Sequence, residues 1–165
     1  MMKRLYYYVS ALTIITVLSF SRLEGQKIEY IKIPELEKIL KNPDNKLFVV
    51  NFWATWCPPC VSEMPGFVKV AKDYDPAKVR FILISLDFPS QVEKQLIPFL
   101  KKNNITLEVA VMTDIDYNAW INKVDPDWQG DIPATLFYNN SKKTRYFHPG
   151  EVSEPELKKY INSLL

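Results

Sequence analysis

The chain contains two cysteines, and both lie in one short segment, Cys57-Pro58-Pro59-Cys60, directly after Trp56. A disulfide that staples an exported domain usually joins distant residues, because closing a long loop restricts the unfolded chain more. A pair separated by two residues closes almost nothing, so its role is chemical. A structural zinc site needs four ligands, and the single histidine, His148, is distant in sequence. Covalent haem attachment needs a histidine where Val61 stands. The sequence therefore predicts neither a metal nor a cofactor.

Thiol–disulfide exchange fits this spacing. Two cysteines three residues apart on the first turn of a helix face the same side and can form a disulfide. The N-terminus of the helix presents free N–H groups and partial positive charge, which favour a thiolate. Pro58 and Pro59 suit the first turn, where a backbone N–H has no helical partner. We therefore predict that Cys57 is the exposed attacking thiolate, with a pKa below the free value of about 8.5. The shielded Cys60 would resolve the mixed disulfide.

The segments around the pair predict an alternation of strands and helices. Nearly continuous apolar runs are typical of strands buried on both faces, whereas helices show apolar residues at helical spacing. The strands are expected at 47–53, 79–86, 107–112, 134–138 and 143–147, the last two as a hairpin. The helices are expected at 35–41, from 58 to about 74, at 90–103, 116–123 and 154–164. We therefore predict one α/β domain, with a central mixed sheet flanked by helices.

Residues 1–25 differ from the rest of the chain. Two basic residues are followed by residues 5–20, sixteen residues without a charge. This run is too short and too rich in tyrosine for a membrane-spanning helix, which needs about 20 apolar residues. It predicts a secretory signal peptide, and an uncleaved N-terminal membrane anchor is the alternative. In both cases the domain at 26–165 is expected in the periplasm, either free or anchored facing it.

The charge balance excludes one class of partner. The chain carries a net charge of +2, and removing residues 1–25 leaves 18 basic and 18 acidic residues. A neutral domain offers no electrostatic footprint for nucleic acid. We expect a monomer that contains a real hydrophobic core, because 47% of the residues are hydrophobic.

With their neighbours, the cysteines resemble a known family. Residues 49–60, which read Val-Val-Asn-Phe-Trp-Ala-Thr-Trp-Cys-Pro-Pro-Cys, together with 63–65 and 130–135, resemble the TlpA-like and ResA-like thiol–disulfide oxidoreductases. The resemblance covers about residues 30–165. It implies a thioredoxin-like fold with the cysteine pair at the N-terminus of a helix, which Pro65 should kink. It also implies reduction of protein disulfides with electrons from a membrane dithiol donor, in cytochrome c maturation or in periplasmic redox homeostasis.

The resemblance assigns a substrate-binding surface as well. X-Pro bonds are cis in only about 5–6% of cases, so the residues alone would predict a trans bond before Pro133. In the family the matching proline is cis, lies beside the cysteines and exposes the backbone of the preceding residue, here Ile132, to substrate. Trp56, Pro58 and Pro59 are expected to complete this surface.

Glu63 is the candidate for proton transfer. Cytoplasmic thioredoxins carry a buried aspartate that accepts a proton where this chain has Asn51, and asparagine cannot titrate. Glu63 lies three residues after Cys60 in the same predicted helix. In ResA-like relatives the matching glutamate influences the protonation of the cysteines. A partly buried glutamate would have a raised pKa and could exchange protons near neutrality. The alternative is an ordinary solvated helix residue.

Two other functions remain open. A peroxidase-like enzyme of the same fold would need a peroxidatic cysteine in its own proline-rich loop, with a nearby threonine and arginine. A non-catalytic binding module of this fold would usually have lost one of the two cysteines, and both are present.

Overall fold

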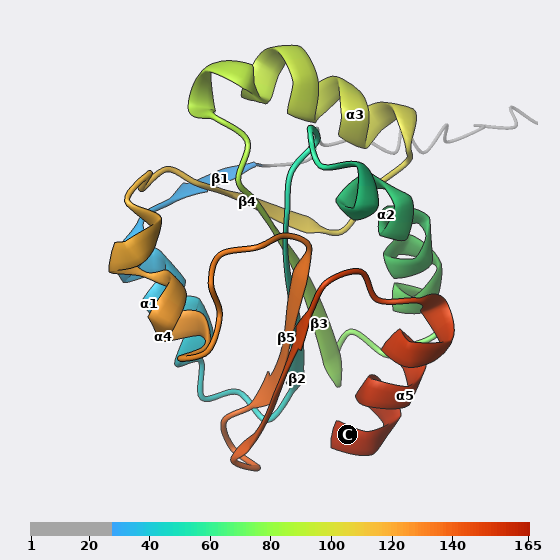
Figure 1. Ribbon diagram of the computed structural model, residues 1–165. Helices are drawn as coiled ribbons and strands as arrows, with labels where there is room; N and C mark the ends of the chain where they lie inside the picture. Colours follow the sequence, from blue (N-terminus) through green and yellow to red (C-terminus); the bar gives the residue numbers. More distant parts are fainter. Residues whose placement is uncertain (1–27) are drawn as a thin grey trace, which may run out of the picture.

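The computed structural model describes residues 28–165 and contains a six-stranded sheet with helices on both faces (Figure 1). The strands follow the order β1-β4-β3-β2-β5-β6, with β2 and β3 at the centre. Their bounds are β1 Glu29–Ile31, β2 Leu47–Trp53, β3 Val79–Ser85, β4 Glu108–Met112, β5 Ala134–Asn139 and β6 Thr144–Pro149. The first four are mutually parallel, while β5 is antiparallel to β2 and β6 to β5. The predicted mixed sheet and hairpin are confirmed; β1 was not predicted. The predicted leader lies outside the described residues.

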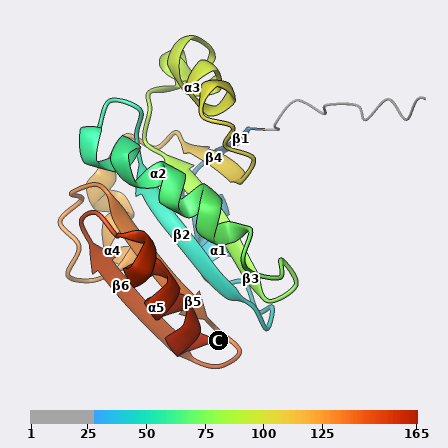
Figure 2. The same cartoon turned by 90° about the vertical axis from the view of Figure 1, so that its right-hand side faces the viewer.

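Helices cover both faces of this sheet. The α-helices are α1 Ile33–Leu40, α2 Pro58–Ala71, α3 Ile97–Lys102, α4 Ile121–Val124 and α5 Glu154–Leu164. In the two perpendicular views α1 and α4 lie on one face, and α2, α3 and α5 on the other (Figures 1 and 2). No helix within residues 28–165 has the length and apolar character needed to cross a membrane.

The helix predicted at 90–103 is interrupted. A 3₁₀ turn at Pro89–Gln91 and a π-helical turn at Val92–Leu96 precede α3. Pro98 lies in the first turn of α3 and has no backbone N–H to donate to the preceding turn, and the regular α-helix begins only there. The shorter helix predicted at 116–123 is likewise divided into a 3₁₀ turn at Tyr117–Ala119 and α4. By contrast, α2 continues past Pro65 to Ala71.

Strand β2 separates the two cores. All seven of its residues are buried, and successive side chains point to opposite faces. Phe48, Val50 and Phe52 belong to the apolar cluster beneath α1 and α4. Leu47, Val49 and Trp53 belong to the cluster beneath α2, α3 and α5, which also contains both cysteines. Asn51 lies on the same face of β2 as Leu47, Val49 and Trp53 and is therefore the polar residue of this strand that faces α2.

The loops next to the cysteine pair and to Pro133 meet at one edge of the sheet. Strands β2, β3 and β4 are parallel and end there, and β5 is antiparallel to β2 and begins there. The sheet thereby brings together the segment before α2, the loops after β3 and β4, and the residues just before β5. Ligand sites of open α/β sheets commonly lie outside this carboxyl edge.

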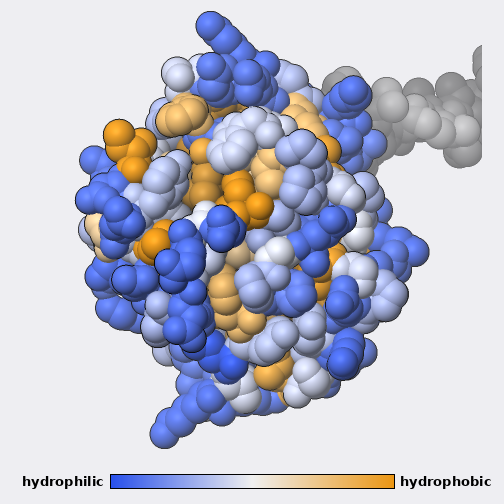
Figure 3. All heavy atoms as spheres, viewed as in Figure 1, coloured by the Kyte–Doolittle hydropathy of each residue, from blue (hydrophilic) through white to orange (hydrophobic). Residues whose placement is uncertain are grey.

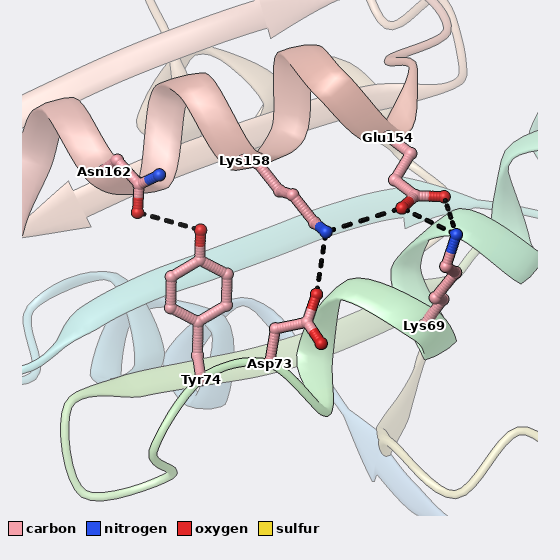
Figure 4. A network of polar contacts seen from close by, with 6 residues as sticks. All are labelled: Lys69, Asp73, Tyr74, Glu154, Lys158 and Asn162. Atoms are coloured by element: carbon pink, nitrogen blue, oxygen red, sulfur yellow. Dashed lines mark hydrogen bonds and ion pairs between the residues drawn. The ribbon is translucent and has the colours of Figure 1, made fainter.

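A polar network on the surface joins α5 to the end of α2 (Figure 4). Its contacts are Lys69 with Glu154 (2.9 Å), Lys158 with Asp73 (2.8 Å) and Glu154 (3.5 Å), and the Tyr74 hydroxyl, which donates to Asn162 Oδ1 (2.9 Å). Exposed ion pairs contribute little to stability, so the network orients the two helices more than it stabilises them. It keeps the loop that precedes α5 close to α2.

Candidate active site

Cys57 and Cys60 form a disulfide whose Cα atoms are 5.3 Å apart. Cys57 is the N-cap residue of α2 in extended conformation, and Pro58 and Pro59 occupy its first two positions. The backbone N–H of Cys60 donates to Cys57 Sγ over 3.3 Å. A sulfur that receives a hydrogen bond from the first turn of a helix is well placed to carry negative charge after reduction.

The sequence predicted an exposed Cys57, and this is wrong in degree. Cys57 is only 5% exposed, while Cys60 is fully buried. The reason is the approach of the segment before β5: the Ile132 carbonyl oxygen lies 3.7 Å from Cys57 Sγ. Both cysteines are therefore buried, and Cys57 is only slightly more exposed than Cys60.

The residues predicted to bind substrate differ in their exposure. The Ile132–Pro133 bond is cis, as the resemblance implied, and Pro133 is buried while Ile132 is half-buried. Trp56 is 56% exposed, and the two prolines of the motif are exposed as well. Of these five residues, Ile132 contacts the sulfur of Cys57 through its carbonyl oxygen, and the role of the group in substrate binding stays a prediction.

Glu63 is buried, which excludes the alternative of a solvated helix residue. The Asn51 amide donates to Glu63 Oε1 (2.8 Å) and to Thr135 Oγ1 (3.0 Å), and the Val152 N–H donates to Glu63 Oε2 (2.9 Å). The carboxylate thus joins the active-site helix to β2 and to the loop before α5. Glu63 follows Cys60 by three residues on the buried face of α2, which places the two side chains on neighbouring turns.

Burial raises the pKa of Glu63 from its ordinary value of 4.5 to about 7. The hydrogen bonds from Val152 and Asn51 oppose this effect, and the nearby charge of Glu151 adds to it. The Oδ1 atom of Asn51 is buried and has no hydrogen-bond partner. If the Asn51 amide turns over, this oxygen can accept from a protonated Glu63, so the site can hold the carboxyl group in either protonation state.

Asp87 is a functional candidate that the sequence analysis missed. It lies two residues after the end of β3 and is 1% exposed. Its carboxylate accepts from the Thr55 N–H (3.1 Å), the Thr55 hydroxyl (2.5 Å) and the Ser85 hydroxyl (2.7 Å). Thr55 precedes Cys57 by two residues, so Asp87 fastens the segment before the cysteine pair to the end of β3. A polar residue at the end of a buried strand was the available signal.

Within residues 28–165 no group of three His, Cys, Asp or Glu side chains is arranged to hold a metal ion. His148, at the end of β6, contacts the Glu151 carbonyl oxygen through Nε2 (3.2 Å).

A family model described as the AhpC/TSA family matches residues 23–147. The chain belongs to this family. Thioredoxin-like protein YneN of Bacillus subtilis is 24% identical over 145 residues, covering 84% of this chain and 79% of YneN. Thiol-disulfide oxidoreductase ResA of Halalkalibacterium halodurans is 23% identical over 139 residues, covering 84% of this chain and 68% of that protein.

Solved structures agree with this AhpC/TSA assignment. A thioredoxin-related protein from Neisseria meningitidis serogroup B superposes with a TM-score of 0.64 at 26% identity, covering 75% of this chain and 88% of that one. The fold is thioredoxin-like, as predicted. Because this family member carries the bonded Cys-x-x-Cys pair and is similar to several ResA proteins, it is a thiol–disulfide oxidoreductase.

Proposed function

We propose that this enzyme is an exported reductase of protein disulfides. Its substrates would be polypeptides that carry a disulfide, and a dithiol protein of the membrane would return the electrons. Maturation of c-type cytochromes and general redox homeostasis of the periplasm both require this chemistry. The observation that carries the proposal is the position of Cys57 at the N-terminus of α2, with its sulfur beside the Ile132 carbonyl and the Cys60 N–H.

The proposed reaction has two exchanges. In the reduced enzyme the Cys57 thiolate attacks one sulfur of the substrate disulfide, forming a mixed disulfide and releasing the other sulfur as a thiolate. The Cys60 thiol then loses its proton and attacks Cys57 Sγ, which forms the observed disulfide and releases the second substrate sulfur. Two electrons pass to the substrate. Glu63 is proposed to take up the proton from this pair and to return it to solvent, since its pKa of about 7 suits transfer near neutrality.

Alkylation and trapping test the two cysteine assignments. Iodoacetamide should modify Cys57 of the reduced enzyme much faster than Cys60, and equal rates would contradict the assignment. Cys60→Ser should accumulate a mixed disulfide with a protein substrate, because nothing resolves it. Cys57→Ser is the matched control and should accumulate none.

A redox titration of the cysteine pair tests the direction of electron flow. A potential near that of thioredoxin, about −270 mV, supports a reductase. A potential near about −120 mV, as in strongly oxidising relatives of this fold, would reverse the proposed direction.

The peroxidase-like alternative is not supported by an observation at the site. Both cysteines of the chain are consumed in one pair. The arginines of the described residues are engaged elsewhere: Arg80 pairs with Glu108, and Arg145 donates to the Val124 carbonyl.

A further inference from the structure

Phe88 is a large apolar side chain that remains in water beside the active site. It follows the buried Asp87, yet it is 55% exposed. Its backbone is extended, and the next residue is Pro89, which begins a 3₁₀ turn and restricts the loop. A single exposed apolar residue is ordinary. Phe88, however, is one of several exposed apolar residues at this edge of the sheet.

The contact between Thr55 and Asp87 brings together the two loops that carry Trp56 and Phe88. Each of these aromatic residues directly follows one member of that bonded pair. The Leu86 N–H also donates to the Trp53 carbonyl (2.8 Å), so the two loops leave the sheet side by side. Figures 1 and 2 show them adjacent in both views, at the end of the sheet that carries the N-terminus of α2.

Exposed apolar residues are concentrated at this edge. Among residues 28–165, seven large hydrophobic side chains are exposed, and four of them lie in loops that follow β2, β3 and β4. These four are Trp56, Phe88, Ile115 and Tyr117. Figure 3 shows hydrophobic surface in the upper part of this face, over the loops before α2 and β5 and the loop after β4. Their common position at the edge that holds Cys57 points to recognition of a partner.

The charge of the same loops narrows the chemistry of that partner. The segments 54–59, 86–91, 113–118 and 129–134 contain four aspartates and no lysine or arginine. Asp87 is buried and engaged, but Asp116 and Asp131 are exposed. An acidic segment would be repelled here and a basic one attracted, while a neutral apolar segment would meet no repulsion.

We propose that Phe88 determines substrate specificity: with Trp56 it binds an apolar side chain beside the disulfide-bonded cysteine of an extended, neutral or basic polypeptide. This inference rests on the proposed function, because it names the substrate class of the same site. The substrate backbone would lie along Ile132, whose carbonyl borders Cys57. Phe88 and Trp56 would flank that backbone on the side of the loop after β3.

Disulfide-bonded peptides test the proposal directly. Three peptides would differ only in the residue before one cysteine, which is Leu, Ser or Glu. The reduced full chain should reduce the Leu peptide with a kcat/KM about tenfold above that of the Ser peptide. The reason is that Leu, unlike Ser, buries apolar surface against the two aromatic side chains on binding. The Glu peptide should be slowest. In Phe88→Ser the ratio of Leu to Ser should fall to about threefold, since Trp56 remains.

Tyr30→Ser is the matched control, because Tyr30 is similarly exposed but lies on the outer strand β1. It should keep the tenfold ratio. Equal rates for the Leu and Ser peptides, or an unchanged ratio in Phe88→Ser, would overturn the inference. A concentration-dependent dimer that Phe88→Ser abolishes would overturn it too, by assigning the surface to a second copy of the chain. If the enzyme reduced none of the peptides and also failed to reduce a small disulfide such as bis(2-hydroxyethyl) disulfide, the proposed function itself would be contradicted.

Discussion

Asp87 and Glu63 are both buried carboxylates beside the cysteine pair, but they are held by different groups. Asp87 accepts hydrogen bonds from one backbone N–H and two hydroxyls, all from Thr55 and Ser85. Glu63 accepts from one backbone N–H and one side-chain amide, which come from segments 89 and 12 residues away. The first carboxylate fastens two adjacent loops. The second lies between a helix, a strand and a distant loop.

The difference indicates two roles for buried charge at one site. The partners of Asp87 are Thr55, in the loop that carries Trp56, and Ser85, at the end of β3, so its contacts hold that loop in place at the proposed substrate-binding edge. The partners of Glu63 only partly offset its burial, and its pKa is raised to about 7. Asp87 is therefore a positioning residue, and Glu63 is suited to exchange a proton.

The largest effect is expected from Asp87→Ala. It leaves the Thr55 N–H and two hydroxyls without their acceptor in a buried site. Each unsatisfied buried group costs about 1–3 kcal/mol, so the free energy of unfolding should fall by about 4 kcal/mol. Urea denaturation measures this loss. The control is Asp127→Ala, at an exposed position, which should cost less than about 0.5 kcal/mol. Equal effects of the two substitutions would show that the hydrogen bonds of Asp87 do not stabilise the fold.

A second prediction concerns the pH dependence that Glu63 confers. Its pKa is raised from 4.5 to about 7 by folding. Between these pH values the unfolded chain has released a proton that the folded chain still holds, so stability falls as the pH rises through this interval. The loss attributable to Glu63 should be about 3 kcal/mol. Glu63→Gln cannot titrate and should lack it.

The measurement is urea unfolding of the wild type and of Glu63→Gln at several pH values from 4.5 to 8. As the pH rises, the wild type should lose stability relative to Glu63→Gln. Glu151→Gln is a useful companion, because it removes only the neighbouring charge that adds to the shift. Parallel pH profiles of stability for wild type and Glu63→Gln would show that folding does not change the pKa of Glu63.

The comparison of the two carboxylates also shows what the sequence could predict. The cysteine pair, the buried strand 47–53 and the hairpin follow from local patterns, and the structure confirms them. The position of Glu63 in α2 was predicted too. Its burial was left open, because burial depends on Val152, which belongs to a loop 89 residues later. A glutamate on a helix surface looks the same in sequence whether or not such a loop covers it.

Other features were missed for related physical reasons. Strand β1 has three residues, of which only Ile31 is buried, and it pairs with β4 some 80 residues away. Such a segment has too little periodicity to be recognised. Asp87 was missed because it follows a continuous apolar strand, where a polar residue is expected as part of an ordinary turn. Its partner Thr55 comes near it only through the pairing of β2 with β3.

A smaller effect is expected from Thr135→Val, which tests how Asn51 is held. The Asn51 amide donates both to Glu63 and to the Thr135 hydroxyl. Removing this hydroxyl deprives the amide of one acceptor and should cost about 1 kcal/mol. Thr144→Val is the matched control, because the Thr144 hydroxyl is buried without a partner and its loss should cost nothing. A neutral Thr135→Val would mean that Glu63 alone orients Asn51.

The smallest effect concerns the reactivity of Cys57 and connects the buried carboxylate to the proposed chemistry. Glu63 and Cys60 occupy neighbouring turns of α2, so an ionised carboxylate there opposes a thiolate on the cysteine pair. Glu63→Gln removes that charge and should lower the pKa of Cys57 by about half a unit, which corresponds to about 0.7 kcal/mol. Alkylation by iodoacetamide below this pKa should then be about threefold faster than in the wild type.

Asp87→Asn is the informative comparison, because Asp87 acts through the geometry of the loops. This substitution should alter the preference among peptide substrates and leave the pH midpoint of alkylation unchanged. If Asp87→Asn moved that midpoint and Glu63→Gln did not, the roles of the two carboxylates would have to be exchanged.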